Sequence, residues 1–160
     1  MKTFARILHG LMSTSLILLA VSAWPTAGWS QPCEVKTLLD KWAYALEHST
    51  PGAPDQIVST YDPIRGVLLP TCDNGPLVGQ SEIKGYFKHF LELEPKATFE
   101  SSATGGDCAS GFASGLYNFK VKGGQVLRAR YTYVFIRGLI AQHHSSLEPK
   151  PPLPQGCPLH

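Results

Sequence analysis

The sequence lacks several features that mark common functional classes. It has no large excess of charge of one sign, because 14 Lys and Arg stand against 12 Asp and Glu in 160 residues. No run of basic residues is present, which argues against nucleic acid or an anionic membrane as a partner. Neither a GxxxxGK[ST] nor a GxGxxG motif occurs, so no nucleotide-binding loop is predicted. The length and the 43% of hydrophobic residues suit one globular domain.

A hydrophobic run long enough to cross a membrane is also missing. Two basic residues precede the apolar stretch 7–21, which is shorter than the roughly 20 residues of a membrane span. Small residues follow this stretch, as at the cleavage site of a secretory signal. We therefore expect residues 1–30 to be a signal peptide and the mature chain to begin between Trp24 and Gln31. The mature protein is then periplasmic or secreted, without membrane attachment.

Four cysteines lie beyond the predicted signal, at Cys33, Cys72, Cys108 and Cys157. No CxxC pair occurs, so the pattern does not favour a zinc or thioredoxin-like site. An even number in an oxidising compartment predicts two disulfides. We favour Cys33–Cys157, because chain ends often lie close together, and hence Cys72–Cys108. The other connectivities, and one disulfide with two buried thiols, stay open.

The first part of the mature chain has the apolar spacing of helices. A stripe at i, i+3, i+4, i+7 predicts a helix over residues 34–48. A short helix follows from Asp55, then a short strand at 67–69. Ser81 is the expected N-cap of a third helix, which ends at Pro95.

After Pro95 the hydrophobic period changes from 3.6 to 2, which indicates strands. The last of these strands are joined by tight turns at 122–125 and 137–138. The sequence therefore predicts an α+β domain over residues 31–149, with helices on one side of a curved antiparallel sheet. Residues 150–160 are proline-rich and are expected to form an extended tail.

Short blocks occur along the chain in a fixed order, at Lys41–Leu46, Ile57–Asp62, Val67–Thr71, Gly79–Phe90, Ser114–Phe119, Ala129–Val134 and His143–Ser146. Together they resemble the nuclear-transport-factor-2-like superfamily, which includes SnoaL-like proteins. The closest resemblance is to the association domain of calcium/calmodulin-dependent protein kinase II and to the small exported bacterial proteins that share it. One departure is the short turn at Arg137-Gly138, where that family has a longer, charged turn.

The resemblance implies a cone-shaped curved antiparallel sheet wrapped around the N-terminal helices and open at one end. It also implies assembly of the chain with itself, as a homodimer or a larger ring. It implies neither kinase activity nor calmodulin binding, because the phosphotransfer motifs and a basic amphipathic helix are absent from this sequence. No cofactor is expected.

Arg130 is the first candidate for ligand binding. It alternates with Thr132, Val134 and Ile136 along a predicted strand, so it places a cation on an otherwise apolar face. The resemblance places a pocket arginine at this position. Because a buried guanidinium needs a counter-ion, Arg130 is either a clamp for a ligand carboxylate or half of an internal ion pair.

His143 and His144 are the second candidates. Neighbouring residues of a strand point to opposite faces, so the pair is not expected to hold one metal ion. A two-residue turn at 137–138 pairs His143 with Thr132 on the face of Arg130, and a one-residue shift in register puts His144 there instead. The resemblance favours His144. Both remain candidates, and a hydrogen-bonded structural role is the alternative for each.

Two further groups of residues have simpler interpretations. Tyr117, Phe119, Tyr131 and Tyr133 are expected to pack in the core or in a dimer interface. Asp62 precedes a proline, so a role in the turn is favoured over an acid–base partnership with the tyrosine before it.

Three functions therefore stay open. The first is an exported, non-catalytic dimerisation module that binds a small anionic or apolar molecule in its cone. The second is an isomerase, dehydratase or cyclase that uses His143 or His144 as a base and Arg130 as an oxyanion stabiliser. The third is an oligomerisation scaffold with a filled cone. The volume of the interior cavity separates the third from the others.

Overall fold

The computed structural model describes residues 33–71, 73 and 75–148. The predicted signal peptide and the proline-rich tail lie outside these residues. None of the described helices is long and apolar enough to span a membrane. The elements, in chain order, are α1 (Val35–Glu47), α2 (Asp55–Val58), β1 (Val67–Leu69), β2 (Leu77–Val78), α3 (Gly79–Phe90), a 3₁₀ turn (Leu91–Leu93), β3 (Lys96–Gly106), β4 (Ser110–Lys120), a second 3₁₀ turn (Lys122–Gly124), β5 (Val126–Ile136) and β6 (Leu139–Leu147).

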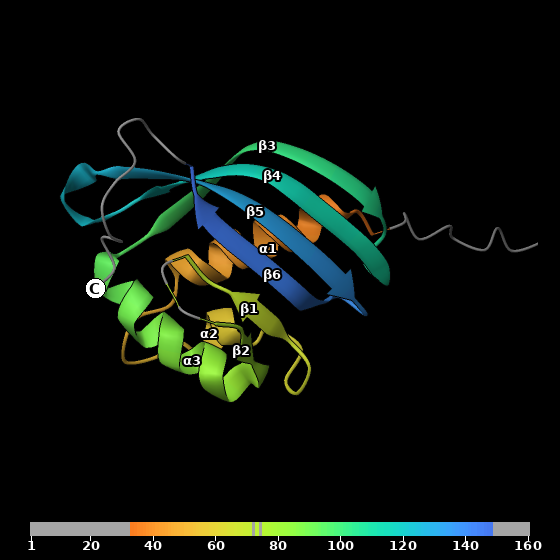
Figure 1. Ribbon diagram of the computed structural model, residues 1–160, viewed down its shortest axis with the longest axis horizontal. Coiled ribbons are helices and arrows are strands. Elements are labelled where there is room, and N and C mark those ends of the chain that lie inside the picture. The colour runs from red at the N-terminus through yellow and green to blue at the C-terminus, as the bar shows by residue number, and fades with distance from the viewer. Residues whose placement is uncertain (1–32, 72, 74, 149–160) are drawn as a thin grey trace, which may run out of the picture. The chain divides into compact units, whose positions relative to one another are not determined.

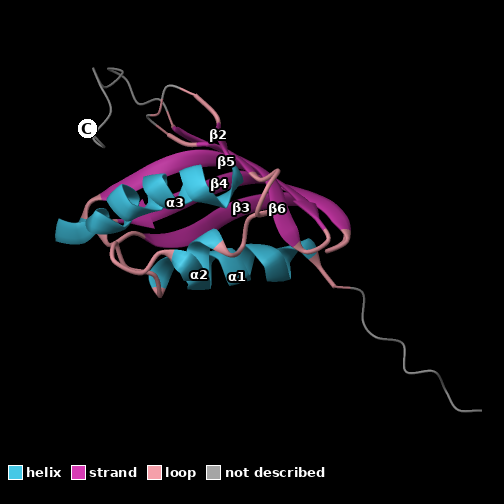
Figure 2. Cartoon of the chain, turned by 90° about the horizontal axis from the view of Figure 1, so that it is seen from below, coloured by secondary structure: helices cyan, strands magenta, loops and turns pink. Residues whose placement is uncertain are grey.

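Six strands form one curved sheet in the order β2-β1-β6-β5-β4-β3. All neighbours are antiparallel except β1 and β6, which run parallel. The three helices lie on one side of this sheet, and the long strands β3–β6 arch over α1 (Figures 1 and 2). The α+β class with helices against a curved sheet, predicted from the change of period, is confirmed.

The helices bury the apolar faces that the sequence indicates. Helix α1 turns its stripe inward, with Leu39, Trp42 and Leu46 almost fully covered. Helix α3 begins at Gly79, two residues before the predicted cap at Ser81. The Glu82 carboxylate accepts a hydrogen bond from the Val78 N–H at 2.7 Å, which stabilises this earlier start.

The concave face of the sheet is aromatic. Tyr117 and Phe119 on β4, and Tyr131, Tyr133 and Phe135 on β5, are all buried. Their rings contact one another and Trp42 of α1. The predicted packing role of these aromatic residues is thus confirmed, and it is a role in the core of the domain.

A bulge decides which residues of β6 face this core. Arg137 and Gly138 form the predicted two-residue turn, both with positive φ, and Phe135 pairs with Ile140 as such a turn requires. The pairing then shifts by one residue, so that Val134 lies opposite Gln142. The predicted pairing of Thr132 with His143 is therefore wrong, because the extra residue in β6 turns every later side chain to the other face.

The disulfide of the described residues joins Cys33 to Cys108, with Cα atoms 5.4 Å apart. It ties the start of α1 to the turn between β3 and β4, where the Cys108 N–H also donates to the Cys33 carbonyl. The favoured pairings, Cys33–Cys157 and Cys72–Cys108, are therefore wrong. The closeness of the chain ends was a poor guide, because the long β3–β4 hairpin brings its turn to α1. Cys72 and Cys157 lie outside the described residues.

Candidate functional site

His143 lies at the centre of the concave face. Only 3% of the His143 surface is exposed, and the imidazole ring stacks on the ring of Tyr133 with centroids 4.1 Å apart. The Trp42 ring meets the imidazole edge-on from α1. Strand β6 thus delivers a polar ring into an aromatic core, where polar atoms require hydrogen-bond partners.

Those partners form one chain of hydrogen bonds that crosses the core. Trp42 is buried under the sheet at one end, and Thr71, just after β1, is half-buried at the other. The links in order are Trp42 Nε1–H to Tyr61 Oη at 3.1 Å, Tyr61 Oη with His143 Nδ1 at 2.8 Å, His143 Nε2 with Tyr117 Oη at 3.4 Å, Tyr117 O–H to Ser145 Oγ at 2.5 Å, and Ser145 Oγ with Thr71 Oγ1 at 2.8 Å.

Every titratable side chain in this hydrogen-bond chain is neutral at physiological pH. Burial, with a smaller contribution from His144, lowers the pKa of His143 to about 3. Burial likewise raises the pKa of Tyr61 and of Tyr117 above the usual tyrosine value. Desolvation dominates because no carboxylate among the described residues contacts the imidazole. A histidine with so low a pKa is a weak general base.

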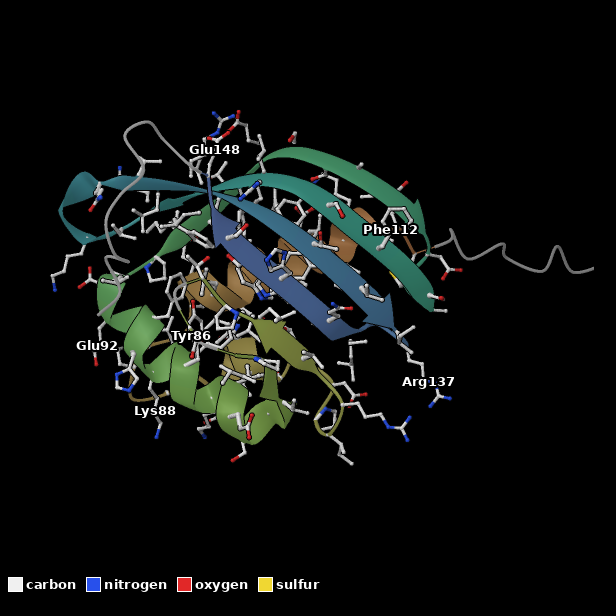
Figure 3. The ribbon with its side chains drawn as sticks, viewed as in Figure 1. Tyr86, Lys88, Glu92, Phe112, Arg137 and Glu148 are labelled. Atoms are coloured by element: carbon white, nitrogen blue, oxygen red, sulfur yellow. A yellow bond between two sulfur atoms is a disulfide. The ribbon has the colours of Figure 1, made fainter. Side chains whose placement is uncertain are left out.

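A small cavity opens beside the Thr71 end of the chain. Its volume is about 20 Å³, room for one water molecule. The floor is buried and the mouth is half-buried; Tyr86, which Figure 3 shows on α3, belongs to the mouth. The buried lining residues are Leu68, Phe87, Phe90, Tyr117, Phe119, Ala129, His143 and Ser145, and the half-buried ones are Thr71, Tyr86, Leu127 and Leu147.

Of the predicted site residues, only His143 lines this cavity. Arg130 is exposed, and the register places Thr132 and His144 opposite each other on the same convex face as Arg130. The prediction that Arg130 lies on an interior face is wrong, since that face of β5 is the outer one. Among the described residues no acidic side chain forms an ion pair with Arg130, so the internal ion pair is wrong as well.

The sequence did not indicate the other members of the chain. Ser145 follows His143 by two residues, so strand alternation alone puts both on one face. Tyr61 was considered only with Asp62, whose carboxylate accepts hydrogen bonds from the N–H groups of Ile64 and Arg65. The turn role of Asp62 is thereby confirmed. Trp42 and Thr71 had no signal, because their roles depend on contacts far apart in the sequence.

Two other features of the interior bear on chemistry. The Tyr133 hydroxyl is buried without a hydrogen-bond partner among the described residues. In the same part of the chain, no three His, Cys, Asp or Glu side chains lie close enough to hold a metal ion. His143 and His144 point to opposite faces, as predicted.

A larger hollow of about 540 Å³ lies between α1 and the edge strand β3. Of its charged lining residues, Lys36 pairs with Asp40, Glu100 pairs with Arg128, and Glu34 is exposed. The hollow is open to solvent, and none of its described polar lining residues is buried. The cavity beside His143 is therefore the stronger candidate for a site.

Comparison with known proteins finds solved structures with a similar architecture. A calcium/calmodulin-dependent protein kinase II association-domain protein from Xanthomonas campestris is similar at 34% identity, with a TM-score of 0.64. The match covers 72% of this chain and 86% of that one. No protein-family model and no curated protein matches the sequence.

More distant solved structures share the fold alone. A steroid delta-isomerase from Pseudomonas aeruginosa is 15% identical, with a TM-score of 0.54. The match covers 75% of this chain and 85% of that one. A nuclear-transport-factor-2-like protein from Cytophaga hutchinsonii is 12% identical, covers 76% and 96%, and has a TM-score of 0.53.

Proposed function

Because the chain belongs to the calcium/calmodulin-dependent protein kinase II association-domain family, we propose that it is a non-catalytic module that assembles with itself. The observation that carries this proposal is the apolar patch on the convex face of the sheet. Phe112 is 49% exposed and Ile136 is 44% exposed, on neighbouring strands. Val134 lies directly opposite Phe112 in the register. Exposed apolar clusters of this kind mark interaction surfaces.

The interior supports a module rather than an enzyme. Aromatic side chains fill much of the concave face, and the cavity that the described residues line beside His143 has a volume of about 20 Å³. His143, the one buried histidine among the described residues, has a pKa lowered to about 3, and no described carboxylate lines the cavity. An isomerase or cyclase of this fold needs a base whose pKa is matched to its task. Proton abstraction by His143 is therefore the weaker alternative.

Light scattering during gel filtration tests the self-assembly. We expect the wild-type chain to run as a dimer or larger oligomer, and Phe112→Asp to shift it towards the monomer. Ile64→Asp is the matched control, because Ile64 is 78% exposed but lies in the loop after α2. A monomeric wild type, or equal effects of the two variants, would overturn the proposal.

We also propose that the module acts outside the cytoplasm. The predicted signal peptide supports this, and the Cys33–Cys108 disulfide is compatible with an oxidising compartment. N-terminal sequencing of exported protein is expected to find a start between Trp24 and Gln31. Exported material that begins at Met1 would contradict the cleavage.

A second role is binding of a small molecule at the cavity beside Thr71. The observation that favours it is the end of the hydrogen-bond chain, where a half-buried hydroxyl meets an apolar hollow. Small-molecule sites combine an apolar lining with a few placed polar groups. The protons of the hydrogen-bond chain that ends at Thr71 determine which ligand charge this cavity favours.

A further inference from the structure

We propose that the cavity beside Thr71 selects a neutral ligand, an apolar body that carries a hydrogen-bond acceptor such as a ketone, and rejects carboxylates. This inference rests on the small-molecule part of the proposed function and is independent of self-assembly. Three features support it: the number of protons in the buried hydrogen-bond chain, the direction of its hydrogen bonds, and the lack of a charged side chain among the described lining residues.

The hydrogen-bond chain contains one more donor proton than it has internal hydrogen bonds. Its members are Trp42, Tyr61, His143, Tyr117, Ser145 and Thr71, and each contributes one N–H or O–H proton when His143 is neutral. These six groups are joined by five hydrogen bonds. One proton is therefore left without an acceptor inside the chain.

The hydrogen bond from Trp42 determines at which end of the hydrogen-bond chain this proton lies. An indole N–H can only donate, so Tyr61 must accept from it and pass its own proton to His143 Nδ1. The imidazole then carries its proton on Nε2 and donates to Tyr117. Tyr117 in turn donates to Ser145. The surplus proton is that of Thr71 or Ser145, whichever of the two hydroxyls accepts from the other.

Both of these hydroxyls line the cavity, so the chain presents a donor to whatever occupies it. A ligand with an acceptor atom satisfies this donor, whereas a hydrocarbon leaves it unpaired at a cost. A water molecule accepts the proton too, but it brings two donors of its own into a lining that is mostly apolar. The cavity is therefore better matched to a carbonyl or ether oxygen.

The cavity offers an anion no compensation for lost water. None of the lining residues that the structure describes is Lys, Arg, Asp or Glu, and the imidazole of His143 is neutral. A carboxylate moved into such surroundings loses its hydration without gaining a counter-ion. The cation that was expected to fill this role, Arg130, lies on the opposite face of the sheet.

The present volume holds only one water molecule, so a larger ligand must displace side chains at the mouth. Tyr86, Leu127 and Leu147 are half-buried there, whereas the residues of the floor are buried. Rotamer changes at the rim of a site are common on binding. The floor, which carries Tyr117, His143 and Ser145 of the hydrogen-bond chain, stays in place.

Three probes of similar size separate the possibilities: acetophenone is a neutral acceptor, benzoate an anion and toluene a hydrocarbon. Their affinities are measured by NMR titration, following the resonances of Ala129 and Thr71. Acetophenone is expected to bind about two- to tenfold tighter than toluene, the worth of one hydrogen bond. Benzoate is expected to bind more weakly than toluene. Benzoate binding as tightly as acetophenone, or acetophenone no better than toluene, would overturn the inference.

Thr71→Val withdraws the surplus proton to Ser145, deeper in the floor. The advantage of acetophenone over toluene is then expected to shrink towards onefold, while toluene binding is unchanged. Thr132→Val is the matched control, because the Thr132 hydroxyl lies on the convex face. An advantage that persists in Thr71→Val but is lost in the double variant Thr71→Val, Ser145→Ala would assign the donor to Ser145. An advantage that is unchanged in both variants would overturn the inference.

A measurement on the wild-type chain keeps the test independent of that variant. Nitrogen chemical shifts of labelled His143 are expected to show a protonated Nε2 and an unprotonated Nδ1. The opposite tautomer would reverse the chain and overturn the argument. If none of the three probes binds while light scattering still finds an oligomer, the ligand site fails and the self-assembly stands.

Discussion

Tyr133 on β5 lies directly opposite His143 on β6, and their rings stack with centroids 4.1 Å apart. This pairing exists because β6 contains one extra residue opposite the step from Val134 to Phe135 in β5. Without that bulge, His143 would face Thr132 on the convex side and His144 would enter the core. One inserted residue therefore determines which imidazole is buried among the aromatic rings.

The stacked pair gives the first prediction. The Tyr133 hydroxyl is buried without a described partner, so Tyr133→Phe removes a desolvated polar group and keeps the ring. We expect the free energy of unfolding to stay equal or to rise by up to about 1 kcal/mol. Urea unfolding measures it. Tyr117→Phe is the control and is expected to lose about 1–2 kcal/mol, because it breaks the bonds to Ser145 and His143. Equal losses in both variants would mean that the Tyr133 hydroxyl has a partner.

His143 predicts a dependence of stability on pH. Its folded-state pKa of about 3 lies below the value near 6.5 of an unfolded histidine. As the pH falls below about 6.5, the unfolded chain takes up a proton that the folded chain refuses, so stability is lost. The loss amounts to a few kcal/mol by pH 3, in addition to that from the carboxylates.

The interval from about pH 6.5 to 4.5 isolates this effect, because the carboxylates titrate mainly below it. We expect the free energy of unfolding to fall across this interval in the wild-type chain and in His144→Gln, since His144 is exposed. In His143→Gln the fall is expected to be much smaller, whatever the stability at neutral pH. An equal slope in His143→Gln would show that another group causes the dependence.

Local patterns predicted much of the fold. The stripe of α1, the change of period after Pro95 and the two-residue turn at Arg137-Gly138 each depend on residues close in the sequence, and all three agree with the structure. The parallel pairing of β1 with β6 was not predicted, because it joins segments about 75 residues apart and leaves no periodic signal.

The candidate site was predicted less well, and the reason is the register of β6. His143 was named, but its companions were sought on the face of Arg130, which is exposed. A bulge has no strong sequence signal, and it reverses the assignment of faces for all residues after it. The hydrogen-bond chain from Trp42 to Thr71 joins one helix (α1), two strands (β4 and β6) and the loops that carry Tyr61 and Thr71. It follows from the folded structure and not from any motif.

The two neighbouring arginines of β5 are expected to differ in their contribution to stability. Arg130→Met removes an exposed cation without a described ion pair, so the free energy of unfolding is expected to change by less than about 0.5 kcal/mol. Arg128 pairs with Glu100 at 2.6 Å and with Glu148 at 3.1 Å, and Arg128→Met is expected to cost up to about 1 kcal/mol, since these groups are partly exposed. Urea unfolding compares the two. A larger loss for Arg130→Met would restore the idea of an internal partner.

The Cys33–Cys108 disulfide gives the last prediction. It spans 75 residues of sequence, and closing a loop of that size stabilises the folded chain by about 4 kcal/mol in the chain-entropy model. The double variant Cys33→Ser, Cys108→Ser is expected to lose about this much in urea unfolding. Digestion of the unreduced wild-type chain is expected to release the Cys33 peptide joined to the Cys108 peptide. A Cys33 peptide joined to that of Cys157 would contradict it.

The same bond also restricts the two other cysteines. With Cys33 and Cys108 joined, Cys72 and Cys157 have only each other as partners within one chain. Thiol titration of the unfolded, unreduced protein is therefore expected to find no free thiol. Adding reductant to the double variant is then expected to lower its stability further, because one disulfide remains to be broken. Two free thiols per chain, with no effect of reductant on the double variant, would show that Cys33–Cys108 is the single disulfide of the protein.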